Sequence, residues 1–124
     1  MSWTKATGGK ISENFSYLEA ACNHCGCITD QETIKKTAAM METIRVKLGG
    51  KPIKVLSWCR CEQHNSAVGG ASDSYHMKGM AVDFVVKHMT PRQVQAALKD
   101  HNGGLGKYLG WTHCDIGPKR RWSG

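Results

Sequence analysis

Residues 74–83 read S-Y-H-M-K-G-M-A-V-D, a histidine followed by an apolar run that ends on an aspartate. The apolar character continues from Met80 to Val86 and predicts a central strand, in which Asp83 is the one ionisable residue. A carboxylate in a buried strand is unfavourable unless it is paired or bound to a metal ion. His76 and Asp83 therefore indicate either two ligands of a metal site or a capping histidine followed by a turn aspartate.

A third candidate ligand lies downstream, in the triplet His113-Cys114-Asp115. Zinc in hydrolases typically takes three protein ligands from His, Asp or Glu and leaves a fourth position for water. A loop histidine, a strand carboxylate and a histidine on a neighbouring strand can converge in this way. If residues 113–115 form a strand, Asp115 shares a face with His113, and Cys114 points to the opposite face and into the core.

The remaining patterns predict an α+β domain with a small antiparallel sheet and helices packed on one side. Ser16 and Glu19 have the spacing of a capping box, Asp30 is a plausible N-cap for a long amphipathic helix, and Thr90-Pro91 starts another helix. Gly, Ser and Asn are frequent between Cys59 and Ser74, which predicts a long loop. The expected order is helix 16–21, helix 30–48, strand 52–57, loop 59–74, strand 80–86, helix 90–99, loop 101–106 and a strand or hairpin over 107–117.

A chain of 124 residues is expected to form one domain, 1–124, with residues 1–10 as a flexible tail. Its 17 Lys and Arg against 10 Asp and Glu give a net charge of +7, which favours an anionic partner such as nucleic acid, a membrane surface or a wall polymer. The basic residues are scattered, and no expected helix carries an arginine stripe with interleaved aromatics, so nucleic-acid binding is not expected. No apolar stretch is long enough for membrane insertion.

The first ten residues lack the apolar segment of a secretion signal, so the chain is expected to be made in the cytoplasm. Reduced thiols or a metal site are then favoured over a disulfide framework for its six cysteines. Three alternatives stay open for one group of cysteines: free thiols, a structural metal ion, or disulfides that join the N-terminal segment to the loop. This group comprises Cys22, Cys25, Cys27, Cys59 and Cys61.

Four ordered segments resemble the D-Ala-D-Ala carboxypeptidase family of zinc metallopeptidases, which includes L-alanyl-D-glutamate endopeptidases. Residues 74–83 match its S-x-H-x-x-G-x-A-x-D motif, and residues 113–122 match the closing H-x-D-x-G-x-x-x-x-W of its compact, single-domain subgroup. Residues 57–71, S-W-C-R-C-E-Q-H-N-S-A-V-G-G-A, resemble the stretch S-G-Y-R-x-x-x-x-N-x-x-V-G-G, and residues 11–19 resemble the opening segment. The resemblance implies the fold shared by hedgehog domains and DD-peptidases.

The resemblance also implies roles for individual residues. His76, Asp83 and His113 would bind one catalytic Zn²⁺, and Ser74 would shape the turn before His76 and contact substrate. Arg60, at the arginine of the family motif, would hold a substrate carboxylate or the oxyanion. The simpler alternative is that Arg60 is an ordinary surface arginine. Trp58 and Cys59 depart from the pattern, which has Gly and Tyr at these positions.

The general base is the least defined part of the predicted site. Many members of the family carry Glu or Asp three residues before the last zinc histidine, and this chain has Gly110 there. Asp115 is the nearest alternative base, and its rival role is a structural carboxylate paired with Arg120 or Arg121. If it is structural, the domain is expected to be a slow enzyme or only a binder.

These observations predict a monomeric zinc peptidase that cleaves peptidoglycan stem peptides, either as a D-Ala-D-Ala carboxypeptidase or as an endopeptidase. It would reach the wall after lysis or in a phage particle. One alternative is a non-catalytic, zinc-containing wall-binding module of the same fold. A second is a basic nucleic-acid-binding protein with a cysteine zinc knuckle, which predicts no metal ion on His76.

Overall fold

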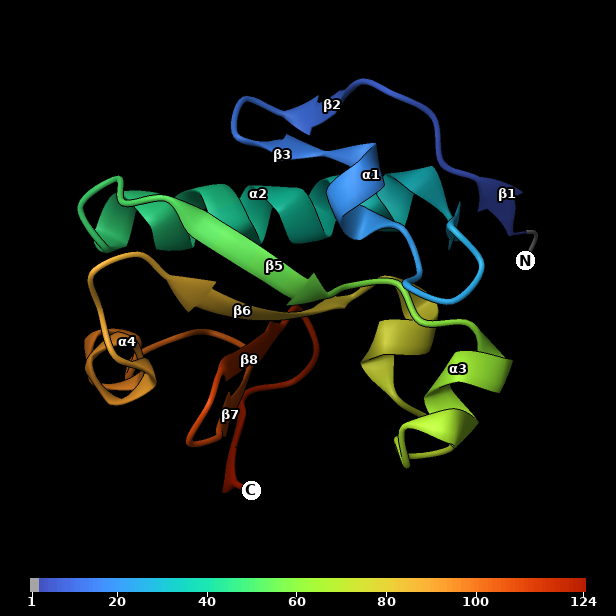
Figure 1. Ribbon diagram of the computed structural model, residues 1–124. Helices are drawn as coiled ribbons and strands as arrows, with labels where there is room; N and C mark the ends of the chain where they lie inside the picture. The colour runs from blue at the N-terminus through green and yellow to red at the C-terminus, as the bar shows by residue number, and fades with distance from the viewer. Residues whose placement is uncertain (1–2) are drawn as a thin grey trace.

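A five-stranded mixed sheet forms the centre of the molecule and carries Asp83, His113 and Asp115 of the candidate site (Figure 1). The computed structural model describes residues 3–124. The helices are α1 (Tyr17–Ala20), α2 (Gln31–Lys47), α3 (Glu62–Ala67), the 3-10 helix η1 (Tyr75–Lys78) and α4 (Pro91–Ala97). The strands are β1 (Thr4–Lys5), β2 (Lys10–Ser12), β3 (Phe15–Ser16), β4 (Cys27–Ile28), β5 (Ile53–Ser57), β6 (Ala81–Val86), β7 (Gly104–Lys107), β8 (Thr112–Asp115) and β9 (Arg120–Ser123).

The main sheet has the strand order β5-β6-β8-β7-β9, and two small two-stranded sheets, β1-β4 and β2-β3, precede it in the chain. The α+β class is confirmed, but the expectation of a wholly antiparallel sheet is wrong, because β9 pairs with β7 in parallel. The reason is topological. After β8 the chain turns back, so β9 runs opposite to β8, and it pairs with the outer edge of β7. Strand β7 also runs opposite to β8, and β7 and β9 are therefore parallel.

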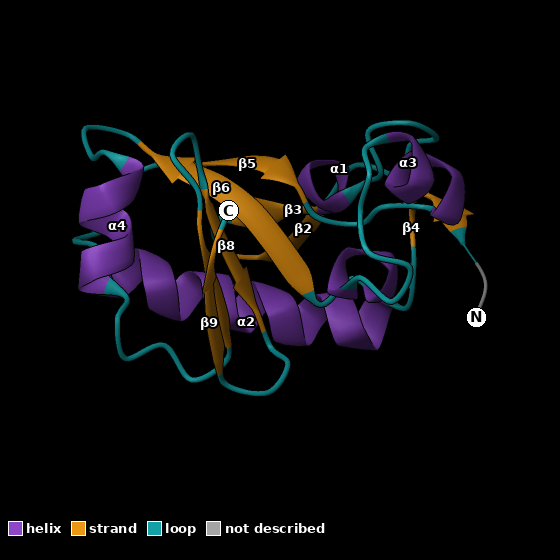
Figure 2. Ribbon diagram, turned by 90° about the horizontal axis from the view of Figure 1, so that it is seen from below, coloured by secondary structure: helices purple, strands orange, loops and turns teal. Residues whose placement is uncertain are grey.

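The two faces of this sheet have different partners because successive side chains of a strand point to opposite sides. Val82, Phe84 and Cys114 belong to the hydrophobic core, as expected for Cys114, whereas Asp83 and His113 alternate with them on the other face. The core also takes apolar side chains from α2 and α4, so these two helices cover the same face of the sheet. Figure 2 shows α4 at one end of the sheet and α3 at the other. The face opposite the core is therefore available for a site.

Three of the predicted helix starts are confirmed by their caps. The Ser16 hydroxyl accepts a hydrogen bond from the Glu19 N–H in a capping box, and Thr90 makes the same box with Gln93. The Asp30 carboxylate accepts the Thr33 N–H at 3.2 Å and starts α2. The buried stripe of α2 follows the predicted helical spacing and comprises Ile34, Thr37, Ala38, Met41 and Ile44.

Two predicted loops contain regular structure. The loop expected over 59–74 contains α3, whose N-cap is the Cys61 thiol, which accepts the His64 N–H at 3.4 Å. Ser, Thr, Asp and Asn are the usual N-caps, so this start carries no ordinary sequence signal. The loop expected over 101–106 contains most of β7, a glycine-rich strand.

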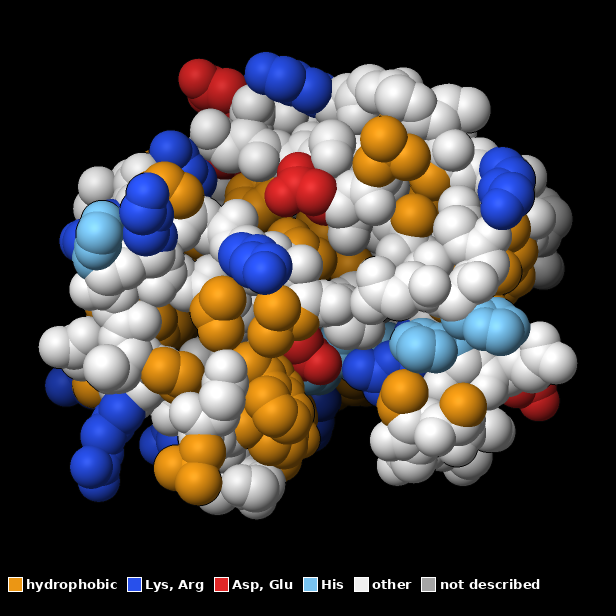
Figure 3. Space-filling model, viewed as in Figure 1, with side chains coloured by type: hydrophobic (Ala, Val, Ile, Leu, Met, Phe, Trp, Pro, Cys, Tyr) orange, Lys and Arg blue, Asp and Glu red, His pale blue; other side chains and the backbone are white. Residues whose placement is uncertain are grey.

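The predicted tail, residues 1–10, includes β1, which pairs with β4. Met1 and Ser2 lie outside the described residues, and flexibility of the tail stays a prediction. Across residues 3–124, no helix is both long enough and apolar enough to cross a bilayer. Figure 3 shows Lys and Arg side chains at several separate places on one face of the molecule, in agreement with their scattered positions in the sequence.

Candidate metal centre

His76, Asp83 and His113 converge on the sheet face opposite the core. Asp83 and His113 are direct cross-strand partners in β6 and β8, and η1 brings His76 to the end of β6. Asp83 Oδ1 lies 3.2 Å from His76 Nε2 and 2.9 Å from His113 Nδ1. One ligand atom from each residue therefore fits in a group within 4.8 Å, as predicted for a three-ligand site.

The backbone of Trp58 fixes the orientation of His76. The Trp58 carbonyl accepts a hydrogen bond from His76 Nδ1 at 2.8 Å, which leaves Nε2 as the nitrogen that faces Asp83. The same Trp58 is fully buried, and its indole N–H donates to the Gly79 carbonyl at 3.1 Å. Trp58 therefore secures both ends of η1, a role that its departure from the family pattern did not reveal.

Asp115 orients His113 from the other side of the imidazole ring. His113 Nε2 donates to Asp115 Oδ2 at 2.8 Å, so Nδ1 is the nitrogen that faces Asp83. Burial lowers the pKa of His113, whereas its hydrogen bonds to Asp115 and Asp83 raise it, and the net shift is upward. Burial raises the pKa of Asp83, but the hydrogen bonds from His113 and His76 outweigh it and hold this pKa well below its usual range.

The carboxylate of Asp115 is completely buried and accepts five hydrogen bonds. Its Oδ1 accepts from the Gly104 and Gly117 N–H groups and from Arg120 Nη1, at 3.1, 2.9 and 3.3 Å. Its Oδ2 accepts from His113 and from Arg120 Nη2, the latter at 2.8 Å. Of the two roles expected for Asp115, these contacts match the structural carboxylate paired with Arg120. They offer little support for a base beside the metal.

The donor set fits zinc. In a tetrahedral site with bonds of about 2.0–2.2 Å, neighbouring ligand atoms lie about 3.3–3.6 Å apart. The distance from Asp83 Oδ1 to His76 Nε2, 3.2 Å, approaches this range, and that to His113 Nδ1, 2.9 Å, is shorter. Both histidines present one nitrogen to the group and have the other nitrogen hydrogen-bonded, as metal-ligating histidines usually do. His76 and His113 are buried, and Asp83 remains ionised, so the three side chains suit a divalent cation.

Arg60 lies beside this group with its guanidinium held by three neighbours. Nη1 donates to Asn65 Oδ1 at 3.1 Å, and Nη2 lies 3.4 Å from Ser57 Oγ and 3.5 Å from Asp83 Oδ2. Nε is buried and has no hydrogen-bond partner within residues 3–124. Arg60 is thus a positioned side chain at the candidate site rather than a free surface arginine.

The site opens into a cleft of about 850 Å³ between an aromatic wall and a glycine-rich loop. On the aromatic side, Tyr108 and Trp111 stack with ring centroids 4.5 Å apart, and Trp122 lies 5.0 Å from the His113 ring. Ser74 also lines the cleft, but its hydroxyl accepts the His76 N–H at 3.2 Å, which caps η1. The aromatic wall was not predicted, although aromatic residues on both sides of the His113 triplet were a signal for it.

The five cysteines treated as one group separate in the structure. Cys22, Cys25 and Cys61 bring their sulfur atoms within 4.8 Å of one another. Cys59 is buried in the core, where burial raises the pKa of its thiol to about 11. Cys27 is outside this 4.8 Å group, although its side chain contacts that of Cys25 and its thiol lies 3.6 Å from the Cys25 carbonyl.

Known proteins resemble this chain over the segments that build the site. The peptidase M15 family model matches residues 13–115, which include all three candidate ligands and Asp115. The chain belongs to the peptidase M15 family. The expected resemblance to zinc metallopeptidases of peptidoglycan is thereby confirmed.

Two curated relatives illustrate the range of this family. The zinc D-Ala-D-Ala carboxypeptidase of Streptomyces albus G is 31% identical over a stretch that covers 89% of this chain and 48% of that protein. The peptidoglycan L,D-endopeptidase MepK of Escherichia coli (strain K12) is 35% identical over a stretch that covers 58% of this chain and 44% of that protein. The chain therefore spans less than half the length of these M15 relatives.

Proposed function

We propose that this chain is a zinc peptidase domain that hydrolyses peptide bonds in the stem peptides of peptidoglycan. The observation that carries the proposal is the convergence of His76 Nε2, Asp83 Oδ1 and His113 Nδ1, with the outer nitrogen of each histidine already hydrogen-bonded. The names of the M15 relatives, an L,D-endopeptidase and a D-Ala-D-Ala carboxypeptidase, support the substrate class.

The three ligands would hold Zn²⁺, which acts as a Lewis acid and makes water nucleophilic at neutral pH. Arg60 would orient the substrate through a carboxylate or stabilise the oxyanion, because it lines the cleft and its Nη atoms are held in place by Asn65, Ser57 and Asp83. Asp115 would keep His113 in the tautomer that leaves Nδ1 free for the metal. The aromatic wall would exclude water and bind the apolar parts of the peptide.

Digestion of purified muropeptides, with product masses determined, tests the proposal. Zinc-loaded wild type is expected to release a fragment whose mass identifies the bond cut, and His76→Ala is expected to release none. A D-alanine product would indicate carboxypeptidase activity, and an internal cut would indicate an endopeptidase.

A second candidate function is a wall-binding module that does not catalyse. It is favoured by the glycine at position 110 and by the fully occupied carboxylate of Asp115, which leave the base unassigned. Binding of muropeptides without turnover, at full zinc occupancy of the histidine site, would establish this function and refute the enzyme.

A further inference from the structure

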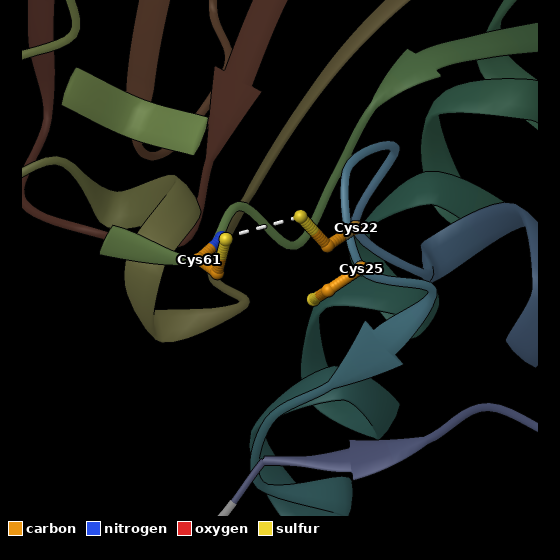
Figure 4. Close-up of side chains that lie close together, drawn as sticks. All are labelled: Cys22, Cys25 and Cys61. Atoms are coloured by element: carbon orange, nitrogen blue, oxygen red, sulfur yellow. Dashed lines mark hydrogen bonds between the residues drawn. The ribbon is translucent and has the colours of Figure 1, made fainter. Parts of the chain in front are cut away.

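Three cysteines from two distant segments meet at the end of the molecule that carries α3. Cys22 and Cys25 lie in the turn between α1 and β4, and Cys61 lies directly before α3 (Figure 4). Their sulfur atoms all lie within 4.8 Å of one another. A tetrahedral Zn²⁺ with Zn–S bonds of about 2.3 Å places its sulfur ligands about 3.8 Å apart, so this spacing matches a shared metal ion.

The turn that carries the first two cysteines is preorganised by its backbone. The Cys22 N–H donates a hydrogen bond to the Cys27 carbonyl, and the Gly26 N–H donates one to the Cys22 carbonyl, both at 2.8 Å. Gly26 has a φ of +71°, a conformation that favours glycine, and this closes the turn. Cys22 and Cys25 are thereby held on one side of the turn, directed toward Cys61.

Backbone N–H groups converge on the Cys22 sulfur. The Cys61 N–H donates to it at 3.4 Å, which is the contact drawn in Figure 4. Burial raises the pKa of Cys22, but the N–H groups of Cys61, Cys25 and His24 outweigh it, and the pKa is lowered. This environment stabilises a thiolate, the form in which cysteine binds metals.

The sulfur atoms of Cys25 and Cys61 lie close enough to that of Cys22 for all three to share one cation. Burial raises the pKa of Cys25 and of Cys61. The Cys27 side chain raises the pKa of Cys25 further, and the Cys22 side chain raises both. A divalent cation among the three sulfurs would remove this repulsion. A disulfide would use only two of the three sulfurs and leave the third without a function.

We propose that Cys22, Cys25 and Cys61 bind a second, structural zinc ion through three thiolates. A surface pocket of about 610 Å³ opens beside Cys25 and Cys61 and is also lined by His24 and Glu62, so water or one of these side chains can complete the coordination. Cys27 and Cys59 are not ligands in this site.

The ion would join the N-terminal segment to the part of the chain that supports the histidine centre. Cys61 follows Arg60, whose N–H donates to the His76 carbonyl at 3.0 Å, and the Cys59 N–H donates to the Ala20 carbonyl at 3.0 Å. Residues 58–61 also supply the Trp58 carbonyl that orients His76. The proposed ion would therefore fix the start of α3 and the position of Arg60, and it does not depend on the peptidase proposal.

Native mass spectrometry of the full chain, prepared with zinc and a thiol reductant, tests the site by counting ions. Wild type is expected to carry about two zinc ions, whereas Cys61→Ser and His76→Ala are each expected to carry about one. The ion that remains in Cys61→Ser shows that this variant still folds. Cys27→Ser is the matched control, a thiol of the same segment outside the cluster, and is expected to keep both ions.

Cobalt provides a readout that is independent of activity. His76→Ala loaded with Co²⁺ is expected to show the near-ultraviolet charge-transfer band of thiolate-bound cobalt. The double variant His76→Ala, Cys22→Ser is expected to lack this band. The proposal is overturned if wild type binds one ion that His76→Ala removes. It is equally overturned if two cysteines form a disulfide under reducing conditions, or if Cys27→Ser loses an ion as Cys61→Ser does.

Discussion

At the scale of single residues, Asp115 shows how hydrogen bonding decides between two chemical roles. A carboxylate has about four lone-pair sites, and five donors already surround that of Asp115, two of them from Arg120. Burial raises its pKa, but the hydrogen bonds from His113 and Arg120 outweigh this and hold it well below the usual range. Such a group is a poor proton acceptor near neutral pH, so its contribution is to position His113.

Asp115→Asn separates the positioning role from the role of base. Without the negative charge, His113 loses its charged acceptor, and zinc affinity is expected to fall about 10–100-fold, as for other residues that orient metal ligands. Competition with a chelator measures the affinity, and kcat/KM at saturating zinc is expected to recover most of the wild-type value. Unchanged affinity together with a loss of 10²-fold or more in kcat would instead identify Asp115 as the base.

Arg60→Lys tests whether the fixed guanidinium serves the substrate. An ammonium group has no planar fork and cannot contact Asn65, Ser57 and Asp83 in the geometry of the guanidinium. We expect kcat/KM on muropeptides to fall at least about tenfold. A rise in KM alone would indicate a carboxylate contact, and a fall in kcat would indicate oxyanion stabilisation. Arg92→Lys, an exposed arginine at the start of α4, is the control, and equal effects of the two substitutions would refute a role for Arg60.

At the scale of elements, the glycines of strand β7 are explained by the side chains that pack against it at the site. A Cβ atom on Gly104 would lie 2.3 Å from an Asp115 carboxylate oxygen, and one on Gly106 would lie 2.7 Å from the Trp122 ring. The glycines of β7 therefore leave the room in which Asp115 and Trp122 pack on the site face. The strand is regular because of its neighbours β8 and β9, and its own sequence has little strand propensity.

Gly104→Ala is expected to lower the free energy of unfolding by about 1–3 kcal/mol, since Asp115 has to move to accommodate the methyl group. Gly110→Ala is the matched control in the loop before β8, where a Cβ atom would meet nothing within 4 Å. Its effect is expected to stay within about 0.5 kcal/mol. Urea denaturation compares the two variants, and similar losses in both would contradict the close packing at Gly104.

The helices and strands differ in how far the sequence predicts them. Helix α2 and strand β6 follow from apolar spacing, because each buries a continuous stripe or face against the core. Helix α3 and strand β7 do not, since α3 starts on a cysteine cap and the glycine-rich β7 depends on its pairing with β8 and β9. The parallel pairing of β9 is likewise a property of the assembled sheet, and no local pattern encodes it.

At the scale of the whole molecule, the candidate ligands were predictable and their orientations were not. Residue types, motif spacing and the need to pair a buried Asp83 indicated His76, Asp83 and His113 from the sequence. Which imidazole nitrogen faces the cleft depends on the Trp58 carbonyl and on Asp115, and these reach the histidines only through tertiary packing. The role of Asp115 likewise depends on the partners of its two carboxylate oxygens, and tertiary packing supplies these partners.

The net charge of +7 is also a property of the whole molecule, because its Lys and Arg are scattered along the sequence and over the face drawn in Figure 3. Such a charge attracts anionic polymers over a Debye length, which shortens as salt is added. Binding to walls that retain their anionic polymers is therefore expected to fall several-fold between about 50 and 300 mM NaCl. Sedimentation with insoluble walls measures the bound fraction, and walls stripped of these polymers are the control. Retention that is independent of both salt and polymer would show that specific contacts, and not overall charge, hold the protein on the wall.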